Sequence, residues 1–333
     1  MTKAFPIQDQ KKIVVIGGGS GQPVILRGLK RFEVDLTAII TVADDGGSSG
    51  KLRDYLKMVP PGDIRNVMAE LSGLDQDFTD IFQYRFKEGD EFLTGHALGN
   101  LFIAGVAEKE GGIFPAIQYL SKLMKIKGHV YPVVNEPLEL HARFSDGTTM
   151  CGEAEITAAH KRIEEVWVTS SNVNAEPRAS KEVVDAILDA DVVVLGPGSL
   201  YTSILPNVVV PNVAAALRAT RAKVVYIANI MTQKGETESF SDGDHLRVIN
   251  DHANTQIVDA VIMNRGIVPE DYIDWKHWNE LSYQVASDPD EVSAQGAVPI
   301  IGDLLELRDD GAFHDGNVVA ELLMQIANNN DVN

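Results

Sequence analysis

Five short apolar runs along the chain predict buried β-strands. Each is continuous in Val, Ile and Leu instead of alternating with polar residues, and each ends in a loop that contains Gly, Asn or Asp. Strands that are covered on both faces of a parallel sheet have this pattern. The runs occupy residues 12–17, 36–43, 191–196, 223–229 and 257–264.

Helical periodicity lies between these runs. Amphipathic segments at 23–32, 180–190 and 210–220 follow or precede the apolar runs, so that strand and helix alternate. This alternation predicts a doubly wound α/β fold with a mostly parallel sheet.

Other segments have different patterns. Residues 130–170 alternate apolar and polar positions around the turn SDGTT, which predicts a small antiparallel β insertion. Residues 63–128 are mainly helical in pattern, and residues 317–327 predict a final helix. Since no internal repeat or Pro/Gly/Ser-rich linker divides the chain, we expect a single α/β domain over 1–333. Within it we expect a flexible start at 1–10 and a disordered tail at 328–333.

The charge balance excludes two classes of partner. The chain has 29 Lys and Arg against 48 Asp and Glu, a formal net charge of -19. Such a surface repels nucleic acid and anionic lipid. No apolar run approaches the ~18–20 residues of a membrane span, and the start of the chain has no signal-peptide core, so we expect a cytoplasmic protein. Cys151 is the single cysteine, which rules out an intrachain disulfide. We expect it to have a packing role, because no base lies near it in the sequence.

The loop GGGSG follows the first predicted strand and precedes the first predicted helix. Glycines there let the backbone approach a phosphate, and the helix N-terminus adds partial positive charge. The dinucleotide-binding pattern G-x-G-x-x-G/A is incomplete, because Gln22 stands at its third position. A tight turn without a ligand is the alternative. The candidate phosphate-binding residues are Gly17, Gly18, Gly19, Ser20 and Gly21.

A second glycine loop, TVADDGGSSGKLR, follows the second predicted strand. Its acidic pair, Asp44 and Asp45, could bind a ribose, coordinate Mg²⁺ or position an acceptor hydroxyl. A Gly-Ser turn with solvated aspartates is the alternative. If the protein is an enzyme, Asp44, Asp45 and His96 are the candidate catalytic residues, and Asp45 is the candidate Mg²⁺ ligand. The candidate binding residues of this loop are Gly46, Gly47, Ser48 and Ser49.

Four more polar clusters lie among glycines and prolines, two of them directly after predicted strands. Because ligands of open α/β sheets bind outside the carboxyl ends of the strands, we expect these clusters to converge there. Arg65 could contact a diphosphate or pair with a carboxylate, and His96 could be a general base or a structural hydrogen-bonding residue. The candidate binding residues are Arg65, Asn66, Asn100, Gly196, Gly198, Ser199, Tyr201, Thr202, Asn229, Thr232 and Gln233.

The ordered motifs GGGSG, TVADDGGSSG, PPGDIRN, GHALGN, GPGSLYTS and MTQKGET resemble the bacterial gluconeogenesis-factor family, the YvcK-like proteins. That family is related to the CofD-like 2-phospho-L-lactate transferases. The resemblance runs from about residue 12 to 265 and then thins, so residues 265–300 are expected to be a divergent segment of helix and loop. An aromatic residue there, such as Trp275, could stack on a ring of the ligand or pack at a surface.

The resemblance implies a cytoplasmic protein with a Rossmann-like three-layer core. It implies binding of UDP-sugars such as UDP-N-acetylglucosamine and a need for the protein in cell shape and growth on gluconeogenic carbon sources. It further implies a protein partner in envelope precursor synthesis, and we expect a homo-oligomer. By the same resemblance, residues 17–21 hold the nucleotide diphosphate, and Asn66, His96 and Asn100 line the same cleft.

Three functional hypotheses remain at this point. The first is a nucleotide-sugar sensor, which requires no cofactor. The second is an Mg²⁺-dependent transferase that moves a phospholactate or phosphoenolpyruvyl group from a nucleotide diphosphate donor. The third, a dinucleotide-dependent oxidoreductase, is disfavoured by Gln22 and by the absence of a Tyr-x-x-x-Lys pair. The sequence does not distinguish uridine from guanosine as the base.

Overall fold

The structure is a computed structural model that describes residues 10–87, 93–170, 176–278 and 281–328. The predictions of a flexible start and a disordered tail fall mostly outside these ranges. Residue 328, which was assigned to the tail, is the last residue of a helix, Gly316–Asn328 (α13).

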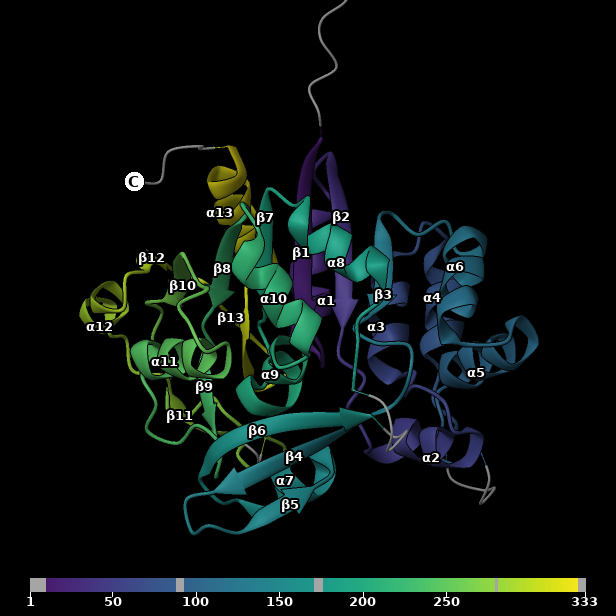
Figure 1. Ribbon diagram of the computed structural model, residues 1–333, viewed down its shortest axis with the longest axis horizontal. Coiled ribbons are helices and arrows are strands. Elements are labelled where there is room, and N and C mark those ends of the chain that lie inside the picture. The colour runs from purple at the N-terminus through teal and green to yellow at the C-terminus, as the bar shows by residue number, and fades with distance from the viewer. Residues whose placement is uncertain (1–9, 88–92, 171–175, 279–280, 329–333) are drawn as a thin grey trace, which may run out of the picture.

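Within the described residues, a parallel sheet of seven strands forms the centre of the fold (Figure 1). The predicted doubly wound α/β fold is therefore confirmed. All five predicted strands belong to this sheet, because their apolar side chains on both faces are buried by helices. In spatial order the strands are β12 (Val298–Gly302), β10 (Ala260–Asn264), β8 (Lys223–Ile227), β7 (Val192–Leu195), β1 (Lys11–Gly17), β2 (Val34–Ile40) and β3 (His129–Pro132).

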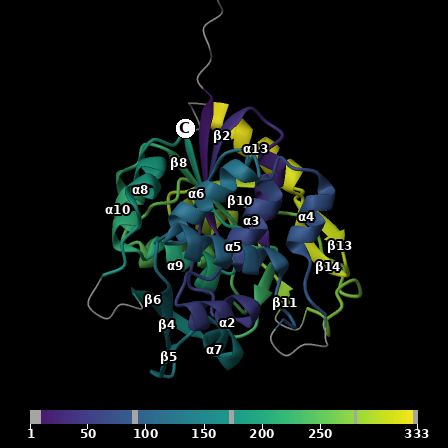
Figure 2. The same ribbon diagram turned by 90° about the vertical axis from the view of Figure 1, so that its right-hand side faces the viewer.

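Helices cover the two faces of the sheet, as the edge-on view in Figure 2 shows. One face carries α8 (Lys181–Leu188) and α10 (Pro211–Ala219), and the other carries α1 (Gly21–Leu29), α3 (Gly62–Leu71) and α13. The predicted helical segment 63–128 is confirmed and includes α3. The remaining helices are α2 (Gly47–Leu56), α4 (Gln76–Gln83), α5 (Leu98–Glu110), α6 (Ile113–Leu123), α9 (Leu205–Val208), which follows a π-helical turn (Leu200–Ile204), α11 (Asp242–His252) and α12 (Pro289–Ala294).

The predicted antiparallel insertion exists, with two corrections. Its three strands are β4 (Leu138–Phe144), β5 (Thr149–Cys151) and β6 (Ile163–Ser170), in the order β5-β4-β6. The insertion begins later than residue 130, because β3 pairs in parallel with β2 at the edge of the main sheet. It also contains a helix, α7 (Glu153–Ala159). The insertion lies beside the carboxyl ends of the main strands, at the bottom of Figure 1.

The prediction of only helix and loop for residues 265–300 was wrong. This segment contributes β12, which extends the main sheet beside β10, and β11 (Leu281–Gln284), which pairs with β9 (Met231–Gln233). β12 escaped prediction because it is a partly exposed edge strand that contains Pro299, and it lacks a long apolar run. The hairpin of β13 (Leu305–Arg308) and β14 (Gly311–His314) follows it.

Among the described helices, none alone has the length and apolar composition needed to cross a membrane. Leu200–Val208 and Pro211–Ala219 meet those two criteria only when they are taken together, and the chain bends by 77° between them.

The contact between α1 and α13 leaves no room for a side chain at Gly28. A Cβ at this position would lie 2.0 Å from the backbone oxygen of Gly316 and 2.9 Å from the Cβ of Ala320. We expect Gly28→Ala to lower the free energy of unfolding by about 1–3 kcal/mol, because the two helices must separate. Chemical denaturation measures this change.

Gly105→Ala is the matched control, since Gly105 is exposed in helix α5 and a Cβ there meets no atom of the described residues within 4 Å. This variant should be more stable than the parent by about 0.5–1 kcal/mol. Equal effects of the two substitutions would contradict the assigned contact between α1 and α13.

Candidate functional site

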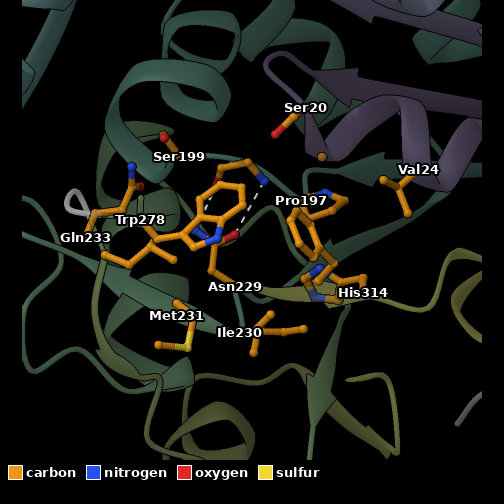
Figure 3. Close-up of a pocket in the computed structure, with 15 residues that line it drawn as sticks. Ser20, Val24, Pro197, Ser199, Asn229, Ile230, Met231, Gln233, Trp278 and His314 are labelled. Atoms are coloured by element: carbon orange, nitrogen blue, oxygen red, sulfur yellow. Dashed lines mark hydrogen bonds between the residues drawn. The ribbon is translucent and has the colours of Figure 1, made fainter. Parts of the chain in front are cut away.

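The candidate site lies at the carboxyl edge of the parallel sheet, where a pocket of about 180 Å³ opens. One side of the pocket consists of Ser20 and Gly21 at the start of α1 and of the loop 197–199 after β7. The other side comes from the loop after β8 and from the C-terminal part of the chain. Figure 3 shows Ser20, Ser199, Asn229 and Trp278 arranged around this space.

The glycine loop places the start of α1 against the loop after β7. Gly19 has a φ of +66°, and a Cβ at Gly21 would lie 2.5 Å from the backbone oxygen of Pro197, so both positions require glycine. The N-cap residue of α1, Ser20, makes no side-chain cap hydrogen bond, and the first turn of the helix contains no acidic residue. A helix start of this kind is suited to an anion. Gln22, at the position where the dinucleotide pattern fails, is buried and donates to the carbonyls of Val15 and Ile39, which joins β1 to β2.

Asn229 holds the loop after β7 in place. Its amide nitrogen donates to the Gly198 carbonyl at 2.9 Å, and its oxygen accepts from the Gly198 N–H at 3.4 Å (Figure 3). The sequence predicted a ligand contact for Asn229. In the structure Asn229 lines the pocket, and its hydrogen bonds also orient the loop after β7. Gln233 lines the same pocket, and its buried side-chain oxygen has no hydrogen-bond partner among the described residues.

An aromatic wall closes the pocket from the C-terminal part of the chain. Trp278 packs edge-on against Phe313, with ring centroids 5.4 Å apart, and its indole N–H donates to the Asp309 carbonyl. His314 is buried beside them, and burial lowers its pKa to about 4. A neutral His314 can donate Nε2–H to the carbonyl of Ala228, 3.0 Å away, next to Asn229. These three residues escaped prediction from the sequence. Trp275, which was considered for stacking, is 40% exposed and does not line the pocket.

A cluster of carboxylates lies against the other side of the glycine loop. The backbone N–H of Gly19 donates to Asp63 Oδ2 at 2.7 Å. Asp44 accepts from the Gly46 N–H at 2.8 Å, and a Cβ at Gly62 would lie 3.5 Å from Asp44 Oδ2. Asp45 accepts from the backbone N–H groups of Glu153 and Ala154, at 3.1 and 2.9 Å, at the start of α7. The insertion therefore brings Glu153, which the sequence analysis missed, next to the predicted acidic pair.

Burial and mutual repulsion raise the pKa of several of these carboxyl groups. Burial raises the pKa of Glu153 to about 8, and the negative charges of Asp44 and Asp45 add to the effect. Burial also raises the pKa of Asp63 to about 6, against the opposing effect of the Gly19 N–H. The pKa of Asp44 is raised, again mainly by burial. A bound cation would favour the charged forms. Within the part of the chain that the structure describes, however, these carboxylate oxygens do not all lie within 4.8 Å of one another, so the cluster is not a formed metal site.

A hydrogen-bonded chain joins the first turn of α2 to the predicted polar clusters around the starts of α3 and α5. Ser48 Oγ lies 2.9 Å from His96 Nδ1 and accepts from the Asn100 amide at 3.0 Å. Arg65 donates to the side-chain oxygens of Asn100 and Asn66, at 3.0 and 2.6 Å. Burial lowers the pKa of His96, so the imidazole is neutral at physiological pH. The predicted cluster is thus brought together, but Arg65 pairs with amides and not with a carboxylate in these contacts.

The structure places some candidate residues away from the pocket. The hydroxyl of Tyr201 is buried and donates to the Ile163 carbonyl at 3.4 Å, and the hydroxyl of Thr232 donates to the Tyr283 carbonyl at 3.0 Å. Thr202 is also buried. None of these three residues lines the pocket. Their role as ligand contacts, like that of the other candidates, stays a prediction.

Comparisons with known proteins are consistent with this geometry. The family model described as "2-phospho-L-lactate transferase CofD" matches residues 13–305. The "Putative gluconeogenesis factor" of Lactococcus lactis subsp. lactis (strain IL1403) is 48% identical over 316 residues, which are 95% of this chain and 97% of that protein. The "Gluconeogenesis factor" of Listeria innocua serovar 6a is 42% identical over 323 residues, which are 97% of each chain.

The fold is also similar to a solved structure. A crystal structure of a Bacillus halodurans protein is 40% identical, has a TM-score of 0.90, and covers 95% of this chain and 100% of its own. A second crystal structure from that organism, described as a member of the UPF0052 family, has a TM-score of 0.89. The resemblance seen in the motifs is thus confirmed. With the family model matching most of its length, this chain belongs to the CofD family and is similar over nearly its whole length to proteins named gluconeogenesis factors.

Proposed function

We propose that this protein is a cytoplasmic regulatory protein that binds a UDP-sugar, such as UDP-N-acetylglucosamine, at the carboxyl edge of its sheet. The observation that carries the proposal is the pocket in which the uncapped start of α1 faces an aromatic wall. Backbone N–H groups at a helix start suit a diphosphate. Trp278 and Phe313 supply a face for a base or a sugar ring. The names of the relatives support a role in gluconeogenic growth, and we extend the proposal to cell shape through a protein partner in envelope precursor synthesis.

The acidic cluster refines this proposal. The cluster lies across the glycine loop from the pocket, and its negative charge would repel a diphosphate held by that loop unless a cation screens it. Asp44, Asp63 and Glu153 would have to draw closer together around an Mg²⁺ ion than they lie in this structure, and the ion would then neutralise charge and orient the phosphates. Asp45, which accepts the backbone N–H groups at the start of α7, would position the ion.

A transferase remains the second candidate function, because the same acidic cluster could serve catalysis. In that reaction an acceptor hydroxyl attacks the distal phosphorus of a nucleotide diphosphate donor, a carboxylate takes the hydroxyl proton, and a nucleoside monophosphate leaves. The contacts of Asp45 favour the regulatory function. Both of its oxygens already accept backbone N–H groups, which suits a positioning residue more than a general base.

Calorimetric titration of the purified protein tests the proposal directly. It should compare UDP-N-acetylglucosamine, GDP and NAD, with and without Mg²⁺, and chromatography should follow the ligand afterwards. Tight binding of the UDP-sugar, recovered intact, is the expected result. Consumption of a donor would favour the transferase, and binding of NAD alone would contradict both functions.

Replacing Trp278 tests the aromatic wall. We expect Trp278→Ala to weaken UDP-sugar binding by about 1–3 kcal/mol, or ~5–150-fold, because stacking on the indole is lost. Trp275→Ala is the matched control, since this exposed tryptophan lies outside the pocket lining. Titration calorimetry measures both affinities. If both variants bind as the parent does, the ligand does not use this wall.

The raised pKa of Glu153 predicts a pH-dependent stability. Between about pH 4.5 and 8, the folded protein retains a proton on Glu153 that the unfolded chain has lost. The free energy of unfolding should therefore fall as pH rises, by up to ~1.4 kcal/mol per pH unit. Glu153→Gln should remove the contribution of this group to the slope, leave that of Asp63, and gain stability relative to the parent as pH rises from 5 to ~8.

Denaturation at a series of pH values, with and without Mg²⁺, measures these slopes. Mg²⁺ should flatten the slope of the parent, because the cation favours the charged carboxylates. Glu155→Gln, an exposed position on the same helix, is the control and should keep the slope of the parent. An unchanged slope in Glu153→Gln would show that this carboxyl group titrates normally.

Asp45→Asn separates the two candidate functions. If the protein is a transferase, this substitution should lower turnover of the donor by at least ~100-fold while the donor still binds, because Asp45 positions the start of α7 and Glu153. If the protein is a sensor, no donor is consumed by the parent either, and the variant changes only the Mg²⁺ dependence of binding. Asp54→Asn, at an exposed position of α2, is the control for a lost surface charge.

A further inference from the structure

Three side chains of the antiparallel insertion converge outside the nucleotide pocket. The ligand atoms of Glu139, His141 and Cys151 all lie within 4.8 Å of one another. The Cys151 thiol lies 3.8 Å from His141 Nε2 and 3.9 Å from Glu139 Oε2. Neither the family resemblance nor the proposed nucleotide site accounts for this combination of a thiol, an imidazole and a carboxylate.

The pairing of the strands explains why these residues meet. Glu139 and His141 are two residues apart on β4, so their side chains lie on the same face of the sheet. Cys151 on β5 is the direct partner of His141 in the antiparallel register. Residues that face each other across an antiparallel pair have neighbouring side chains. The cluster is therefore built on regular strands, which fix the positions of its members.

We propose that Glu139, His141 and Cys151 form a binding site for a zinc-class divalent metal ion. Thiolate, imidazole and carboxylate are the three ligand types that zinc takes from proteins, and three protein ligands leave a fourth position for water. Tetrahedral zinc with a Zn–S bond of ~2.3 Å and a Zn–N bond of ~2.0–2.1 Å places sulfur and nitrogen about 3.5 Å apart. The thiol lies 3.8 Å from the imidazole nitrogen and 3.9 Å from the carboxylate oxygen, so only a small side-chain movement is needed to reach this geometry.

The surroundings of His141 support its role as a ligand. Its ring stacks on Trp167 of β6, with centroids 5.3 Å apart and planes 6° from parallel, which fixes the orientation of the imidazole. Its Nε2 atom is 2.9 Å from the hydroxyl of Thr169. This hydroxyl can donate to Nε2 in the absence of metal, and it would turn away when the metal takes the nitrogen lone pair.

A nucleophilic role for Cys151 is disfavoured. Partial desolvation by its neighbours and the negative charge of Glu139 raise the pKa of the Cys151 thiol, although the residue is exposed, whereas reactive cysteines have a lowered pKa. The packing role expected from the sequence is also wrong, because Cys151 is exposed. An exposed thiol gives a metal ion access from solvent, and binding would release the thiol proton.

The proposed metal site is connected to the acidic cluster of the nucleotide site. Asp45 accepts from the backbone N–H groups of Glu153 and Ala154, which follow Cys151 by two and three residues. A metal ion on Cys151 would fix the backbone that holds Asp45. The metal site is nevertheless independent of the identity of the nucleotide, so failure of one proposal leaves the other intact.

The single cysteine makes the test specific. Titration of the full-length protein with Co²⁺ should produce a thiolate-to-cobalt charge-transfer absorption that saturates at one equivalent and disappears when Zn²⁺, which binds such sites more tightly, is added. Only Cys151 can give this absorption. Co²⁺ bound to the carboxylates of the acidic cluster has oxygen ligands and does not produce it. Cys151→Ser should abolish the absorption.

The other two ligands are tested by affinity. We expect His141→Asn and Glu139→Gln each to weaken Co²⁺ binding, followed by this absorption, by at least about tenfold. Glu164→Gln is the matched control, because Glu164 lies on β6 of the same sheet and pairs with Arg143 outside the cluster. This control should bind Co²⁺ as the parent does. Thermal unfolding without metal checks that each variant folds. If His141→Asn does not fold, Glu139→Gln alone is sufficient for the test.

The proposal is overturned by either of two results. One is that Co²⁺ produces no charge-transfer absorption, or produces one that keeps growing beyond one equivalent without saturating. The other is an affinity of folded Glu139→Gln and His141→Asn within twofold of the parent, which would reduce the site to an exposed thiol. A Zn²⁺-dependent rise in Tm that is present in Glu164→Gln and absent in Cys151→Ser would further support it.

Discussion

The close approach of backbone loops at the carboxyl edge of the sheet is the constraint on which the candidate site depends. A Cβ at Gly18 would lie 2.5 Å from the methyl group of Thr41 and 2.8 Å from Asp63. A Cβ at Gly21 would meet the loop after β7. Because glycine removes these clashes, the start of α1, the loop after β2 and the loop after β7 can share one edge. The pocket and the acidic cluster lie on the two sides of this contact.

The acidic cluster shows a compromise between stability and binding. Burying carboxyl groups beside one another costs folding free energy when they are charged, and the raised pKa values of Asp63 and Glu153 express that cost. A protein that needed only stability would place apolar side chains there. Retaining the carboxyl groups is understandable if a cation and a diphosphate meet at this point. The insertion supplies Glu153 and the N–H groups that hold Asp45, so it forms part of the site.

The antiparallel insertion consequently has two roles. One end of it, at α7, completes the acidic cluster. Its sheet carries Glu139, His141 and Cys151 on one face, with Cys151 directly before the segment that leads into α7. A metal ion on that face and a ligand at the carboxyl edge would therefore act on the same short stretch of backbone. This continuity gives the insertion a physical route for coupling the two sites.

The sequence by itself determined the central sheet, the alternating helices and the glycine loops, because these depend on local rules. Continuous Val and Ile runs require burial on both faces, and strand–glycine–helix order brings their loops to one edge. The sequence did not identify β3 and β12 as the edge strands of the main sheet, because a half-exposed edge strand needs no long apolar run. Only the tertiary structure decided that Trp278, Phe313 and Glu153 join the glycine loops and that Cys151 faces His141. These residues come from segments far apart or from a register between strands, and no local pattern encodes which distant side chains the packed chain brings together.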